Sequence, residues 1–207
     1  PYLQDEDLNV RYAVVETLGK LRSVTAVDAL LDLLEAADAG LQFTVFEALA
    51  SIGAGVPVER ILPYAQNALL RKSVFACLGK LGNVAGIPVL LKGLSDPLSR
   101  NRHVALLSFT QLIRTLPEHD CPEVDPQSEQ VVDWLIALLA HENLEYRRAA
   151  CYVLSLFPDA RIVNSILALL AEEELRADIV AVSRMIPKAI LTNLVASSSL
   201  ADENALY

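Results

Sequence analysis

The residues best suited to chemistry gather in one short stretch, where His119, Asp120 and Cys121 are consecutive. Three further acids flank them: Glu118, Glu123 and Asp125. Imidazole, thiolate and carboxylate groups bind metals, and a cysteine thiolate can also act as a nucleophile. However, adjacent residues on a short loop rarely converge on one ion, and short motifs of this kind are weak evidence. The prolines of the same stretch favour a stiff, acidic surface loop, so we expect no metal, no cofactor and no catalytic residue here.

The three cysteines give no second site. Cys77, Cys121 and Cys151 have no close metal-ligand spacing. Cys77 and Cys151 stand among apolar positions of helical patterns, where a thiol packs as a small hydrophobic group. An odd number of cysteines without a pairing framework is typical of a reducing compartment, so we expect a cytoplasmic protein.

The elements that must position these residues recur along the chain. The pattern of Asp7–Leu21, a polar start followed by apolar residues at helical spacing, returns five more times. Successive anchors lie 29 to 31 residues apart, except for one step of 45 between Arg102 and Arg147. The anchors are Arg11, Gln42, Arg71, Arg102, Arg147 and Arg176. A period this constant indicates a repeat array.

Each repeat reads as two short antiparallel helices. In the first repeat, Val10, Val14 and Leu18 form one apolar face, and a second helix follows over about residues 25–35. Its inward positions are Val27, Leu30, Leu31 and Leu34. Neither helix can bury its apolar face alone, so stacking on the next repeat must supply the core.

We therefore predict an all-α superhelix of about six two-helix repeats over residues 1–196. The repeats lie near residues 5–36, 38–66, 67–95, 96–140, 141–171 and 172–196, and the fourth carries an insertion at residues 117–127. Residues 197–207 read as a tail or linker. Pro63 lies inside a helical pattern and should kink or shorten that helix. The chain begins without Met in what looks like the end of a helix, so we expect a piece of a longer protein, whose other parts are one partner.

Composition and charge restrict the partners. The chain has 207 residues, of which 53% are hydrophobic, but no apolar run approaches the ~20 residues of a membrane span. Its net charge is −9, from 17 basic and 26 acidic residues. Affinity for nucleic acid comes largely from Lys and Arg, so nucleic-acid binding is disfavoured. A protein partner is expected, and a basic one fits the charge best.

The segment Asp5–Gly19, which reads DEDLNVRYAVVETLG, resembles the HEAT repeat in its short bacterial, phycobilisome-lyase-type form. The shared pattern is an Asp, then Val-Arg, a small residue and Leu-Gly. The resemblance implies an all-helical superhelix with first helices outside and second helices lining a concave side. Gln42 and Asn101 depart from the pattern, and the last two repeats lack the glycine.

Three enzyme classes carry HEAT-like repeats of this kind, and the sequence can be compared with each. Deoxyhypusine hydroxylases hold iron with repeated His-Glu pairs, whereas this chain has one such pair, His141–Glu142. HEAT-like DNA glycosylases look basic and aromatic on the concave side, whereas this chain is acidic and has one Trp. Phycobiliprotein lyases carry the same repeat type, so a lyase-like or other modifying enzyme that uses Cys121 or His119 stays as the alternative function.

The arginine series favours a structural role. A partly buried guanidinium without a partner is costly, and an acid or amide stands shortly before most anchors. We expect hydrogen bonding between neighbouring turns in a structural ladder. Its members are Arg11, Arg71, Arg102, Arg147, Arg176, Asp7 and Asp38.

The outward side of the second helices is the better place for binding, because solenoids present extended grooves. We predict a non-enzymatic protein-interaction scaffold with an acidic concave groove. The candidate residues are Asp28, Asp32, Glu35, Glu59, Tyr64, Lys92, Asp133, Trp134, Asn164 and Lys188. Tyr64 and Trp134 are included because interface hot spots favour aromatic anchors.

Overall fold

The computed structural model describes residues 2–116, 129–157, 165, 173 and 176–177. The chain divides into two compact units, Pro1–Cys121 and Pro122–Tyr207. The described residues form helices and turns with no strand, which confirms the predicted all-α repeat fold. The insertion at residues 117–127 lies outside the described residues, as does most of the chain after residue 157. The division of those parts into repeats therefore stays a prediction.

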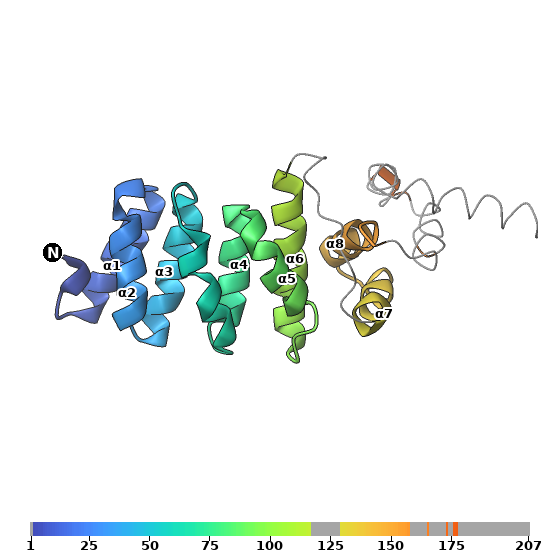
Figure 1. Ribbon diagram of the computed structural model, residues 1–207, viewed down its shortest axis with the longest axis horizontal. Helices are drawn as coiled ribbons and strands as arrows, with labels where there is room; N and C mark the ends of the chain where they lie inside the picture. The colour runs from blue at the N-terminus through green and yellow to red at the C-terminus, as the bar shows by residue number, and fades with distance from the viewer. Residues whose placement is uncertain (1, 117–128, 158–164, 166–172, 174–175, 178–207) are drawn as a thin grey trace, which may run out of the picture. The chain divides into compact units, whose positions relative to one another are not determined.

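The first unit is built from two layers of helices (Figure 1). One layer holds the first helix of each repeat: α1 (Leu8–Lys20), α3 (Ala39–Ile52), α4 (Arg71–Leu81) and α6 (Ser99–Thr115). In this layer α1 packs on α3, α3 on α4, and α4 on α6. The second layer holds α2 (Val27–Ala36), the 3-10 helices η3 (Val58–Arg60) and η4 (Leu62–Gln66), and α5 (Ile87–Gly93). Shorter 3-10 turns are η1 (Tyr2–Gln4), η2 (Val24–Ala26) and η5 (Val84–Gly86).

Local sequence explains where the helices begin and which face they bury. The Asp7 carboxylate accepts a hydrogen bond from Asn9 N at 2.8 Å, and the Asp38 carboxylate accepts one from Leu41 N at 2.9 Å. Each thereby satisfies an amide that has no partner inside its helix. The inward residues predicted for the second helix of the first repeat are buried, and none is more than 4% exposed.

Two glycines permit close contact between successive first helices. A Cβ atom on Gly19 would lie 2.8 Å from Ala48 Cα, and one on Gly79 would lie 2.7 Å from Ser108 Cα. Carbon atoms in contact prefer about 3.5–4.0 Å, so any larger residue would push these helices apart. The Leu-Gly of the repeat pattern therefore sets the spacing of the first layer.

The second repeat departs from the two-helix plan. Its second element is the pair η3 and η4 and not an α-helix. Pro63 lies in the first turn of η4. Proline has no backbone N–H, which is tolerated in a first turn but would break a hydrogen bond in the interior of an α-helix. The shortening expected from this proline is therefore present.

The second unit contains α7 (Glu129–Leu138) packed on α8 (Leu144–Leu154). The buried side of α7 consists of Val131, Val132, Leu135 and Leu138. Asn143 caps α8 by accepting a hydrogen bond from Glu145 N at 2.8 Å. Within the described segments, no helix combines the length and the apolar character that a membrane crossing requires.

Candidate functional site

The predicted acidic residues of α2 and η3 surround one arginine. Arg60 Nη2 lies 2.9 Å from Asp32 Oδ1 and 3.1 Å from Glu35 Oε1. These bonds join the second elements of the first and second repeats. The side chains of Asp32 and Glu35 are 73% and 69% exposed, so the ion pairs are screened by water and contribute little stability. Asp28 and Glu59 are also exposed.

Tyr64 belongs to the same region. Its ring meets Phe46 of α3 edge-on, with 5.6 Å between ring centroids. Burial raises the pKa of the Tyr64 hydroxyl, the negative charge of Glu35 raises it further, and Arg60 opposes this. The structure thus brings Asp32, Glu35 and Tyr64 together around Arg60.

Arg60 was missed by the sequence analysis. Its separation of 28 residues from Asp32 is close to the repeat period, and this was the signal that could have placed the two in neighbouring repeats. We name the exposed surface formed by Asp28, Asp32, Glu35, Glu59 and Arg60 the acidic face.

The other predicted binding residues belong to other elements or lie outside the described residues. Lys92 is exposed on α5. Asp133 is exposed and Trp134 is half-buried on α7 of the second unit. Asn164 and Lys188 lie outside the described residues. A single binding surface made of all these residues therefore stays a prediction.

The repeat anchors share one kind of hydrogen bond. In four repeats the anchor side chain donates to a backbone carbonyl at the end of the preceding second element or, for Arg102, in the turn after it, where carbonyls lack helical partners. The bonds are Gln42 Nε2 to Leu34 O at 2.8 Å, Arg71 Nε to Ala65 O at 3.0 Å, Arg102 Nη1 to Asp96 O at 3.0 Å, and Arg147 Nε to Leu139 O at 2.8 Å. Gln42, Arg71 and Arg147 thus tie their repeats to the preceding second element, and Arg102 binds the turn before its own helix.

The two acids of the predicted ladder cap helices and do not bind the described anchor arginines. Asp7 and Asp38 bind backbone amides at the start of their own helices, as described above, and neither forms an ion pair with Arg11 or another described arginine. Arg11 Nε is buried and has no hydrogen-bond partner among the described residues. Arg176 is exposed in a described helical segment. The short anchor-to-acid spacing therefore reflects helix capping.

Arg71 also forms an ion pair with the following turn. Its Nη1 lies 2.7 Å from Asp96 Oδ2, and the Asp96 side chain is only 2% exposed. The Asp96 carboxylate also accepts hydrogen bonds from Leu98 N at 2.9 Å and Asn101 Nδ2 at 3.1 Å. Burial by itself raises the pKa of Asp96, but these three donors and the charge of Arg71 outweigh it and lower the pKa overall. Asp96 is therefore an ionised carboxylate at neutral pH.

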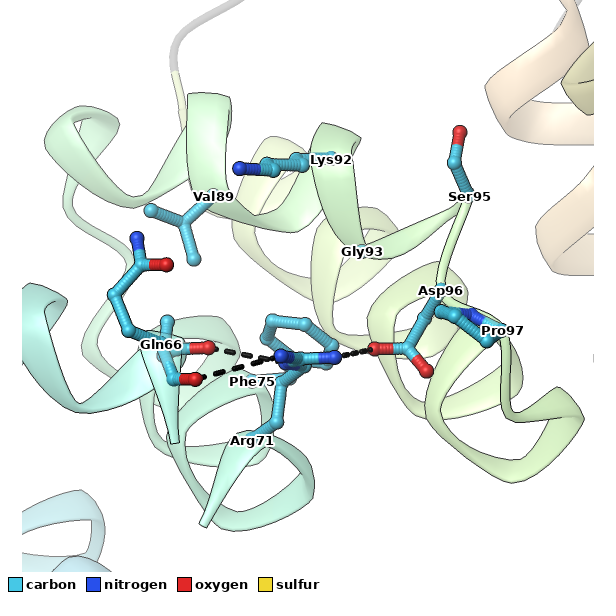
Figure 2. A pocket seen from close by; sticks show the side chains of 10 residues that line it. Gln66, Arg71, Phe75, Val89, Lys92, Gly93, Ser95, Asp96 and Pro97 are labelled. Carbon is cyan, nitrogen blue, oxygen red and sulfur yellow. Dashed lines mark hydrogen bonds and ion pairs between the residues drawn. The ribbon is translucent and has the colours of Figure 1, made fainter. Parts of the chain in front are cut away.

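A cavity of about 210 Å³ opens beside this ion pair (Figure 2). It is lined by residues of the 3-10 helix η4, of helices α4 and α5, and of the turn after α5. Figure 2 shows the Arg71 guanidinium between backbone carbonyls of η4 on one side and Asp96 on the other. The lining residues come from four consecutive segments: Ala65, Gln66, Arg71, Phe75, Val89, Lys92, Gly93, Ser95, Asp96 and Pro97.

The charges of the cavity differ from those of the acidic face. Two cations, Arg71 and Lys92, line it with a single carboxylate, Asp96. Lys92 makes no ion pair with any residue that the structure describes. The sequence analysis predicted Lys92 as a binding residue but did not foresee the cavity, because its lining comes from two repeats and depends on how they pack.

Comparison with known families identifies the repeats. Residues 1–69 match a family described as HEAT repeats. Residues 1–69 therefore carry HEAT repeats. The matched residues include α1, α2, α3 and the η3–η4 pair, so the resemblance stated from Asp5–Gly19 is confirmed over this part.

Solved structures show the same fold. One engineered protein of the Northeast Structural Genomics Consortium is 16% identical, with a TM-score of 0.56 over 92% of this chain and 94% of that chain. Another is 18% identical, with a TM-score of 0.64 over 95% of this chain, and this chain spans 59% of its length. At these identities the likeness is one of fold alone. No curated protein matches this chain.

A third similar structure is the complex of CpcE and CpcF of phycocyanin lyase from Nostoc sp. PCC7120. It is 18% identical, and the match covers 89% of this chain and 91% of that chain. Its TM-score of 0.45 is too low to support any conclusion about the HEAT repeats described above.

The described cysteines are buried, and His103 and His141 form hydrogen bonds within the chain. Burial raises the pKa of the Cys77 thiol to about 12, and the opposing effect of Lys80 is smaller. Cys151 is also buried. His141 Nδ1 accepts a hydrogen bond from Asn143 N at 2.9 Å, which makes it a turn residue. The described segments hold no group of three His, Cys, Asp or Glu side chains that could bind a metal ion. His119 and Cys121 lie outside those segments.

Proposed function

We propose that this HEAT-repeat chain is a non-enzymatic protein-interaction scaffold that binds a basic segment of a partner protein on the acidic face. One observation carries the proposal: α2 and η3 expose four carboxylates, and Arg60 is the cation among them. Neighbouring repeats contribute to this surface, as expected for a ligand that lies along a solenoid.

The energetics of the Arg60 pairs favour exchange with a partner. Exposed ion pairs contribute about 0–1 kcal/mol, so a partner's Lys or Arg can replace Arg60 on Asp32 or Glu35 at small cost. Asp28 and Glu59 are exposed carboxylates that make no ion pair with the described residues, and they are available without any exchange. Complementary charge across such a surface mainly raises the association rate and is weakened by salt.

Charge reversal tests the proposal. The bait variant Asp28→Lys/Glu59→Lys reverses the two carboxylates that are outside the Arg60 pairs. The matched control, Glu16→Lys/Glu47→Lys, makes the same change in net charge on the exposed side of α1 and α3. A defined protein captured from lysate at low salt by the unmodified chain and the control, but not by the acidic-face variant, supports the proposal. Equal capture by all three baits contradicts it.

No observation on the described residues favours the lyase-like alternative. The side chains that it would use, His119 and Cys121, lie outside them. Retention of activity in a His119→Ala/Cys121→Ala variant of an active chain would remove that alternative.

A further inference from the structure

The cavity beside Arg71 presents positive charge within an acidic protein. Arg71 has five N–H donors, and the protein engages three of them, with Ala65 O, Gln66 O and Asp96 Oδ2. The bond to Gln66 O is long, at 3.5 Å. Two guanidinium donors therefore remain for a ligand. Lys92, on the opposite wall, adds an ammonium group that has no carboxylate partner among the described residues.

We infer that this cavity binds a carboxylate side chain, a glutamate or aspartate, of the partner segment that lies on the acidic face. A carboxylate placed between Arg71 and Lys92 would receive charge-assisted hydrogen bonds, which are about twice as strong as neutral ones. Asp96 forms its ion pair with Arg71 and none with Lys92.

The other lining residues indicate which residue type should stand next to the bound Glu or Asp in the partner. Phe75, Val89 and Pro97 give the cavity an apolar side, and Phe75 is only 2% exposed. An apolar residue next to the partner's acid can cover this side. The preferred sequence in the partner is therefore an apolar residue followed or preceded by Glu or Asp.

This inference rests on the proposed scaffold function and makes its partner more specific. The acidic face lies on the second elements of the first and second repeats, and the cavity lies between those of the second and third. One segment that follows the second layer would meet carboxylates first and cations next. Its basic residues and its acid would therefore lie in that order along the partner, in one direction or the other.

Two blocked dipeptides test the cavity without the partner. The probes are N-acetyl-Phe-Glu-amide and N-acetyl-Phe-Gln-amide, which differ in charge but hardly in size. Each is titrated into the isotope-labelled 207-residue chain while the backbone amide signals of Phe75, Lys92 and Gly93 are followed by NMR. We expect the glutamate probe to move these signals at millimolar concentration and the glutamine probe to bind about ten-fold more weakly, for loss of a charge-assisted hydrogen bond.

Two matched variants assign the charge preference. Lys92→Gln should reduce the preference for the glutamate probe to about two-fold or less, because one of two cations is lost. Lys80→Gln removes an exposed lysine of α4 that does not line the cavity, and it should keep the full preference. Equal binding of the two probes to the unmodified chain would overturn the inference, and so would the absence of any shift at these amides.

The two experiments can contradict the scaffold function and the carboxylate site independently of each other. Probe binding that depends on Lys92, together with equal capture by all three baits, would contradict the scaffold and support the cavity as a carboxylate site. Selective capture with unchanged NMR spectra would support the scaffold and overturn the carboxylate inference.

Discussion

The Arg71 guanidinium and the buried Asp96 carboxylate are 2.7 Å apart, although 25 residues separate them in the sequence. The bond connects the start of α4 with the turn that precedes α6, and those two helices pack on each other. Arg71 also donates to the carbonyl of Ala65 in the preceding repeat. One side chain therefore links three successive repeats.

Removal of the Asp96 carboxylate should destabilise the first unit. Asp96→Ala leaves a partly buried guanidinium, Leu98 N and Asn101 without their acceptor, and we expect a loss of about 3 kcal/mol in the free energy of unfolding. Urea unfolding followed by circular dichroism measures this. Arg60→Ala is the control, because it removes exposed ion pairs and should cost less than about 1 kcal/mol. Equal losses in the two variants would contradict the structural role of Asp96.

Lowering the pH should remove the contribution of the ionised Asp96 carboxylate to the free energy of unfolding. The folded pKa of Asp96 is below its unfolded value of about 4, so the unfolded chain takes up the proton first as the pH falls. The stabilisation is complete above about pH 4 and disappears as the pH falls through the folded pKa. We expect the free energy of unfolding to fall more steeply below about pH 4 in the unmodified chain than in Asp96→Asn. Parallel pH profiles of the two chains would rule this out.

The repeat anchors were predictable from the sequence because they depend on a period. Gln42, Arg71, Arg102 and Arg147 take equivalent places, and each binds a carbonyl of the preceding element or of the turn after it. The partners were not predictable in the same way. Asp38, close to Gln42 in sequence, caps its own helix, while the acid that binds Arg71 comes from the next turn.

The acidic residues of α2 were predicted as an open surface, and here the sequence argument was incomplete. Asp32 and Glu35 were predicted as binding residues from helix periodicity, which indicates exposure but not which residue of the neighbouring repeat lies opposite. Arg60 comes from that neighbouring repeat. The cavity escaped prediction for a similar reason, since it forms between η4 and α5, and its shape depends on how two repeats stack.

The glycine contact between α4 and α6 predicts a steric effect. Gly79→Ala places a Cβ atom 2.7 Å from the Ser108 backbone, so the helices must separate. We expect a loss of about 1–3 kcal/mol in the free energy of unfolding, as is usual for overpacking. Gly86→Ala is the matched control, because its new Cβ would make an ordinary contact 3.4 Å from Leu78 Cβ. A thermal melting temperature lowered equally by both changes would argue against a special contact at Gly79.

Cys77 should be chemically inert in the folded chain. Only the thiolate reacts readily, and burial raises the pKa of this thiol to about 12. In a Cys121→Ser/Cys151→Ser chain at about pH 8, we expect labelling by an aromatic disulfide reagent at least about a thousand-fold slower than for a free thiol. Labelling should become fast in denaturant. Rapid labelling of the native chain would show that Cys77 is accessible and contradict its place in the core.

The measurement that tests the scaffold most directly is capture by three baits: the unmodified chain, Asp28→Lys/Glu59→Lys, and Glu16→Lys/Glu47→Lys. The account predicts that one defined protein binds the first and third baits at low salt, is released at high salt, and is absent from the second. Recovery of the same protein by the second bait at an equal level would contradict binding through the acidic face.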